Sequence, residues 1–226
     1  MNQGAARLEF GGDLVALRAD LVAMTVATAD AIRLATSVLL HSRDGDGGEE
    51  ADEIGRLRER VESLRDSVEQ RTHQLLARQQ PVAGDLRLLV AALRITAHTA
   101  RMARLAGHIG QIAARRRPVP VVPQPVVGVV AAMGELAYRI ADGAALTLAA
   151  GDAQDAARLE IDDDSMDELL RRLFSVLLDH WPHGVESAVD LALVGRYYER
   201  FADHAVDIAA SVVFIVSSRR ESEDLM

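Results

Sequence analysis

Apolar residues recur at intervals of three and four along most of this chain, which is the spacing of one face of an α-helix. The first such series runs through Leu14, Leu17, Leu21 and Met24. Glycine, proline and small polar residues interrupt the pattern between successive series. The sequence therefore predicts six helices, over residues 10–41, 49–80, 86–117, 126–150, 153–180 and 185–218.

A proline-rich stretch divides the six predicted helices into two groups of three. Residues 118–125 read PVPVVPQP, and four prolines so close together favour an extended, stiff linker over a helix. We therefore predict a first three-helix unit over residues 1–117 and a second over residues 126–218. Residues 219–226 form a charged tail in this interpretation.

The two groups of helices share a residue pattern, which indicates an internal repeat. Residues 58–64 align with residues 163–169, and residues 100–106 align with residues 199–205. The apolar pairs that this alignment superposes are Val61 with Met166, Val68 with Leu173, and Ile109 with Ile208.

The amino-acid composition supports an all-α fold. Of the 226 residues, 49% are hydrophobic and only 4% are aromatic, a balance that favours helices packed through aliphatic side chains over a β-sandwich. We predict an all-α protein made of two tandem three-helix bundles related by the internal repeat.

Charge and cysteine content narrow the classes of function. Lysine and arginine number 25 against 34 aspartates and glutamates, and the resulting net charge of −9 argues against nucleic acid as the main partner. The sequence contains no cysteine, which excludes disulfides and thiolate metal sites and favours a reducing cytoplasm. The first ten residues lack the apolar core of a signal peptide, so we expect a soluble protein.

Carboxylates gather on one face of each of the last two predicted helices. Asp163 and Asp167 are four residues apart, and so are Glu199, Asp203 and Asp207. Like charges one turn apart on a helix repel each other. If the two helices pack antiparallel, the two acidic stripes face one another and need a neutralising partner.

Two kinds of partner could neutralise these acids. Four or five carboxylates without cysteine make a hard-oxygen site, which suits Mg²⁺, Mn²⁺ or iron. Alternatively, Arg196 and Arg200 each lie three residues before an acid and could form ion pairs within the helix. His204 follows Asp203 directly and is a further potential ligand, although a histidine in this position is more often an ordinary interhelical residue. The spacing alone leaves the metal and ion-pair interpretations open.

The first repeat lacks most of these acids. The residues at the four corresponding positions are Arg58, Glu62, Ala100 and Arg104. We predict that no metal binds in this half and that Arg58 or Arg104 pairs with Glu62.

The sequence gives little support for catalysis. It has no cysteine nucleophile, no serine in a glycine-rich elbow, no Walker-type phosphate loop and no Glu-x-x-His motif of a di-iron enzyme. We therefore predict a protein that is not an enzyme. A metal-dependent hydrolase that uses the acids of the second repeat and a metal-free helical scaffold are the alternatives.

Three motifs resemble those of the PhoU family of phosphate-uptake regulators. They are QQPVAGDLR at residues 79–87, DDSMD at residues 163–167 and ERFADH at residues 199–204. The resemblance covers nearly the whole chain and is closer in the second half. It implies two tandem three-helix bundles, often assembled as a homodimer.

The resemblance also implies metal binding through acidic motifs with a spacing of four residues. Carried over to this chain, the ligands are Asp163, Asp167, Glu199 and Asp203, extended by Asp207. The implied cofactors are iron, manganese, magnesium or zinc cations at the second repeat, and none at the first.

Partners and location follow from the same resemblance. It implies a cytoplasmic protein that contacts the ATPase subunit of the phosphate ABC transporter and a phosphate-sensing histidine kinase. These partners would bring it to the inner face of the membrane. In this role it represses the phosphate-starvation response when phosphate is plentiful.

Overall fold

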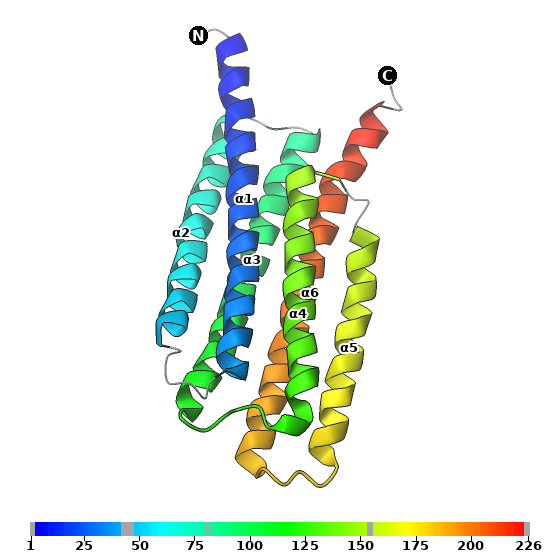
Figure 1. Cartoon of the computed structure of the whole chain (residues 1–226). Coiled ribbons are helices and arrows are strands. Elements are labelled where there is room, and N and C mark those ends of the chain that lie inside the picture. Colours follow the sequence, from blue (N-terminus) through cyan, green and yellow to red (C-terminus); the bar gives the residue numbers. More distant parts are fainter. Residues whose placement is uncertain (1–2, 42–47, 80, 82, 153–155, 224–226) are drawn as a thin grey trace.

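The computed structural model describes residues 3–41, 48–79, 81, 83–152 and 156–223 (Figure 1). Six helices run through these residues, as the sequence predicts, so the all-α prediction is confirmed. The predicted start of the fifth helix at residue 153 lies outside the described residues. The helices are α1 (Gln3–Leu40), α2 (Gly48–Gln79), α3 (Ala83–Arg116), α4 (Gln124–Ala150), α5 (Ala156–Leu178) and α6 (Val185–Glu223).

Four long helices form the centre of the molecule (Figure 1). α1 packs against α3 and α4, and α6 packs against the same two helices. α2 covers the α1–α3 side and α5 covers the α4–α6 side. Each repeat is therefore a three-helix unit, and the two units join through the pairs α1–α4 and α3–α6.

Helix boundaries differ from the predicted ones at both ends of the chain. α1 begins at Gln3, well before residue 10, and passes through Gly11 and Gly12. A glycine inside a helix costs only about 1 kcal/mol relative to alanine, so a long helix can continue through it. α6 continues to Glu223, so the prediction of a separate tail from residue 219 is wrong.

The connection between the repeats is shorter and more compact than predicted. α4 begins at Gln124, inside the predicted linker 118–125, and Pro125 lies in its first turn. Proline suits this position because the first turn of a helix needs no backbone N–H donor. Val121 and Val122 are buried in the hydrophobic core. The prediction of an extended, stiff linker over all of 118–125 is therefore wrong.

One hydrophobic core joins both repeats, and it contains residues of all six helices. Residues that the internal alignment superposes have matching burial. Val61 and Met166 are fully buried, and so are Ile109 and Ile208. The repeat predicted from sequence is thus present in the packing, where equivalent positions face the core.

α1 is apolar enough to resemble a membrane span. Its segment Arg7–Leu40 has a mean hydropathy of 1.4 over its most apolar window and could cross a bilayer by length and composition. In the structure, however, 56% of that window is buried inside the protein, and Leu17, Leu21 and Met24 of α1 are fully buried. Packing of α1 against α2, α3 and α4 therefore accounts for its composition.

A buried hydrogen bond connects the two repeats between α1 and α6. The hydroxyls of Thr36 and Tyr198 lie 2.8 Å apart, and Thr36 Oγ1 also lies 2.8 Å from the backbone oxygen of Ile32. The carbonyl can only accept, so Thr36 donates to Ile32 and Tyr198 donates to Thr36. Burial raises the pKa of the Tyr198 phenol, which keeps this proton in place.

Gly134 of α4 makes room for this contact. A Cβ atom on Gly134 would overlap the side chain of Thr36, so only glycine lets α4 approach α1 at this point. Glycine at position 134 therefore leaves space for the Thr36 side chain, which contacts Tyr198.

The direction of this hydrogen bond predicts unequal effects of its two partners. Thr36→Val leaves the buried Tyr198 hydroxyl without an acceptor and should destabilise the protein by about 1–3 kcal/mol. Tyr198→Phe leaves Thr36 still bonded to Ile32 and should cost only about 0.5–1.5 kcal/mol. Urea denaturation of both variants and of the double variant measures these values. A Tyr198→Phe variant less stable than Thr36→Val would contradict the assigned direction.

Candidate functional site

The packing of α5 against α6 brings four of the five predicted metal ligands together. Asp163 and Asp167 lie one turn apart on α5, and Glu199 and Asp203 lie one turn apart on α6. Burial raises the pKa of Asp163 to about 6, and Asp203, Asp167 and Glu199 each contribute to the increase. The four carboxyl groups therefore lie within electrostatic reach of one another, and we call them the acid cluster.

Arginine neutralises only part of the acid cluster. Arg196 Nη1 donates to Glu199 Oε1 at 2.7 Å, as the spacing of three residues predicts. Glu199 Oε2 is nevertheless buried without a hydrogen-bond partner, and the side chain is only 13% exposed. Burial, followed by the charge of Asp203, raises the pKa of Glu199 in spite of the arginine. A buried carboxylate oxygen in this state still requires a positive partner.

The charge of Asp203 is also incompletely compensated by arginine, although this residue is exposed. Burial raises its pKa first, and the charges of Asp167 and Asp207 add to this effect. Arg196 and Arg200 lower the pKa, but their contribution is smaller than these terms. The ion-pair interpretation is therefore correct for Glu199, and it does not account for all of the charge in the cluster.

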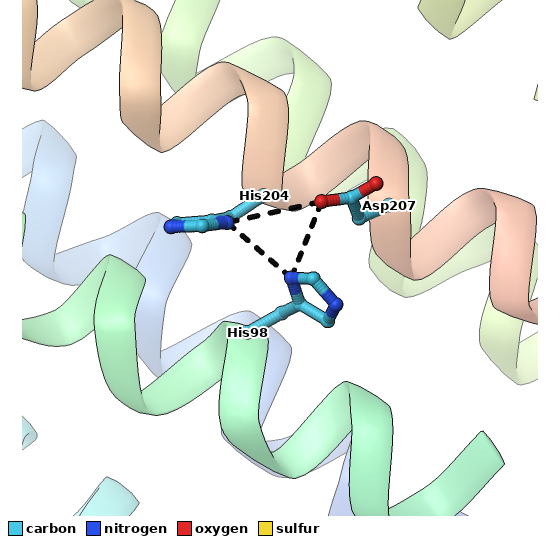
Figure 2. Close-up of side chains that lie close together, drawn as sticks. All are labelled: His98, His204 and Asp207. Carbon is cyan, nitrogen blue, oxygen red and sulfur yellow. Dashed lines mark hydrogen bonds and ion pairs between the residues drawn. The ribbon is translucent and has the colours of Figure 1, made fainter.

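Asp207, the fifth predicted ligand, lies against two histidines (Figure 2). Its Oδ2 atom is 3.4 Å from Nδ1 of His98 on α3 and 3.9 Å from Nδ1 of His204 on α6. The two histidine Nδ1 atoms are 3.3 Å apart. Burial lowers the pKa of both rings, which favours neutral imidazoles.

These three side chains form the tightest group of potential metal ligands in the described residues. Their ligand atoms all lie within 4.8 Å of one another, and no other set of three histidine, aspartate or glutamate side chains described here reaches this proximity. We call His98, His204 and Asp207 the histidine triad. Sequence reasoning missed His98, because it lies 106 residues from His204 and no local spacing connects them.

The first repeat neutralises its remaining acid differently from the prediction. Glu62 lies 2.7 Å from Nη1 of Arg65, which is three residues further along α2. The predicted pairing of Glu62 with Arg58 or Arg104 is therefore wrong. Arg65 follows Glu62 on α2, and an acid that precedes its cation is the favoured order on a helix, whereas Arg58 precedes Glu62. Arg58 instead lines a shallow pocket between α2 and α3.

Comparison with known sequences finds two matches to one family model. The model of the PhoU domain matches residues 21–113 and residues 130–212. Each match covers most of one repeat, and the gap between them contains the connection from α3 to α4.

Two curated proteins of Mycobacterium tuberculosis are similar to this chain. The phosphate-specific transport system accessory protein PhoU homolog 1 is 43% identical over 195 residues, which cover 86% of this chain and 86% of that protein. The accessory protein PhoU homolog 2 is 45% identical over 157 residues, which cover 69% of this chain and 74% of that protein.

A solved structure has a similar fold. The crystal structure of PhoU from Pseudomonas aeruginosa superposes with a TM-score of 0.82 at 22% sequence identity, covering 92% of this chain and 99% of that one. This likeness shows the same helical architecture with two repeats.

The repulsion within the acid cluster predicts that the metal-free protein is less stable to unfolding at neutral pH than at acidic pH. The pKa of Asp163 rises from 3.8 to about 6 on folding, so its contribution to stability is lost as the pH rises from about 4 to 6. In the presence of a chelator, Asp163→Asn should therefore raise the melting temperature at pH 7.5 and change it little at pH 4. Scanning calorimetry at both values tests this.

A matched control for this experiment lies on the same helix. Glu168 is exposed and pairs with Arg171, so Glu168→Gln should leave the melting temperature nearly unchanged at both pH values. Equal melting temperatures of the wild type and Asp163→Asn at pH 7.5 would mean that the carboxylate is already compensated.

Proposed function

Because this chain belongs to the PhoU family, we propose that it is an accessory regulator of phosphate uptake that acts through protein contacts rather than catalysis. The observation that carries this proposal is the 43% identity to a phosphate-specific transport system accessory protein over 86% of both chains. The PhoU domain model matches both repeats, so the similarity covers most of the fold.

The proposed partners are the ATPase subunit of the phosphate ABC transporter and a phosphate-sensing histidine kinase. In this proposal the protein is cytoplasmic, acts as a homodimer, and reaches the inner face of the membrane through these partners. It holds the kinase in its inactive state when phosphate is plentiful. Such a regulator must bind the two states of its partner with different affinities. The six long helices provide a stiff body suited to this task.

We further propose that the acid cluster binds a cation. Asp163, Asp167, Glu199 and Asp203 supply only oxygen ligands, which suit iron, manganese or magnesium and accept zinc. The unpartnered Oε2 of Glu199 and the raised pKa of Asp163 support this assignment. A bound cation would remove the repulsion and hold α5 against α6. The first repeat, with arginine and alanine at the equivalent positions, has no such site in this proposal.

Deleting the gene in its source organism tests the regulatory role. The deletion strain should express phosphate-starvation genes at high phosphate, and a plasmid copy of the gene should restore repression. Since Mycobacterium tuberculosis carries two related proteins, the deletion should be made alone and together with any second copy. Unchanged expression in both strains, measured by transcript abundance, would refute the regulatory proposal.

Metal content tests the cation proposal. Protein purified without chelator should contain at least one equivalent of iron, manganese, magnesium or zinc by mass spectrometry. The double variant Glu199→Ala, Asp203→Ala should lose this equivalent, because two of the four ligands are gone. The control is Asp162→Asn, which removes an acid of α5 that pairs with Arg139. If wild type and double variant both remain metal-free after incubation with iron, the arginines alone balance the cluster.

A further inference from the structure

The histidine triad lies where the two repeats meet, outside the acid cluster. His98 belongs to α3 of the first repeat, whereas His204 and Asp207 belong to α6 of the second. Figure 2 shows the Nδ1 atoms of both rings and one oxygen of Asp207 converging on a common point between the helices. This arrangement combines two nitrogen ligands and one oxygen ligand, whereas the acid cluster offers only oxygen.

The spacing of the three atoms matches a known coordination geometry. Tetrahedral zinc binds histidine nitrogen at about 2.0–2.1 Å, which places its ligand atoms about 3.3–3.4 Å apart. The two Nδ1 atoms are 3.3 Å apart, and the distance from His98 Nδ1 to Asp207 Oδ2 is 3.4 Å. The remaining distance, from His204 Nδ1 to Asp207 Oδ2, is 3.9 Å and shortens by a small rotation of an exposed side chain.

We propose that His98 Nδ1, His204 Nδ1 and Asp207 Oδ2 bind a divalent transition metal of the zinc class, which links α3 of the first repeat to α6 of the second. Three protein ligands leave a fourth position open, as in zinc sites that keep a water molecule. The side chain of Asp207 is 55% exposed, so this position faces solvent.

Hydrogen bonding alone satisfies the triad poorly. Two neutral rings that face each other through Nδ1 can share only one proton, so one nitrogen lone pair serves as acceptor. The proton that one Nδ1 donates to the other is then not available to the Asp207 carboxylate. A metal ion accepts both nitrogen lone pairs and the carboxylate oxygen at once.

The ring of His204 presents only its Nδ1 atom to polar partners. Its Nε2 atom is buried and has no hydrogen-bond partner, so every polar contact of this ring is on the Nδ1 side. The ring is thus directed toward the triad. The positive charges of Arg101 and Arg200 oppose a cation near His204, whereas the negative charge of Asp207 counteracts them. Removing Arg101 should therefore strengthen metal binding.

The internal repeat supplies a matched control site. The alignment that superposes Ile109 on Ile208 places His98 on Tyr197 and His108 on Asp207. The rings of His108 and Tyr197 are in contact, with centroids 5.4 Å apart. The equivalent of His204 is Leu105, so the symmetry-related position has one potential ligand where the triad has three.

Zinc titration of the full chain tests the proposal. After chelator treatment and buffer exchange, isothermal calorimetry with ZnCl₂ should detect one site that is absent or at least about 100-fold weaker in His98→Ala and in His204→Ala. Removing a residue that only hydrogen-bonds to a metal ligand already lowers metal affinity about 10–100-fold. Asp207→Asn, an exposed substitution that preserves folding, should weaken the same site. His108→Ala should bind zinc within about twofold of the wild type.

A second probe separates the triad from the acid cluster. Co²⁺ in the same site should give the intense visible absorption of four-coordinate cobalt, and this absorption should persist in Asp163→Asn, Asp167→Asn and disappear in Asp207→Asn. Zinc binding of unchanged stoichiometry in both histidine variants, or Co²⁺ absorption that disappears only in the acid-cluster variant, would overturn the proposal. So would a folded wild type that binds no zinc. None of these outcomes depends on the regulatory role.

Discussion

The contacts of α1 with α4 and of α3 with α6 hold this molecule together, because neither repeat completes its core alone. Both pairs join one repeat to the other, and the hydrophobic core runs through all six helices. Gly134 allows the close approach at the α1–α4 contact, where Thr36 meets Tyr198. Apolar packing provides the attraction, and these specific contacts select one alignment of the helices.

The acid cluster depends on this packing in a different way. Helices that bury apolar faces against one another also bring their polar edges together, and on α5 and α6 these edges carry carboxylates. The core therefore holds like charges at close range in a partly dehydrated place. Arginine does not fully compensate these charges, so their repulsion destabilises the folded protein. A bound cation would reduce this repulsion.

Local patterns predicted much of the structure and could not predict the rest. The period of the apolar residues gave the six helices, and the spacing of four gave the paired acids on α5 and α6. The start of α4 was missed, because proline at 125 stops a helix from continuing but does not stop one from beginning. The pairing of Glu62 was missed because its partner was sought on the repeat alignment rather than at Arg65. The role of His98 could not be predicted from sequence, because only the packing of α3 on α6 brings it close to His204.

A short segment of α6 contacts three different helices. Tyr198 reaches α1, Glu199 and Asp203 face α5, and His204 and Asp207 meet α3. Successive residues of a helix point about 100° apart, so ten residues of α6 suffice to contact these three helices. A turn of α6 about its own axis would therefore disturb all three contacts together. Binding of a ligand at one of these contacts then changes the binding affinity at another. The two sites affect each other by the same factor.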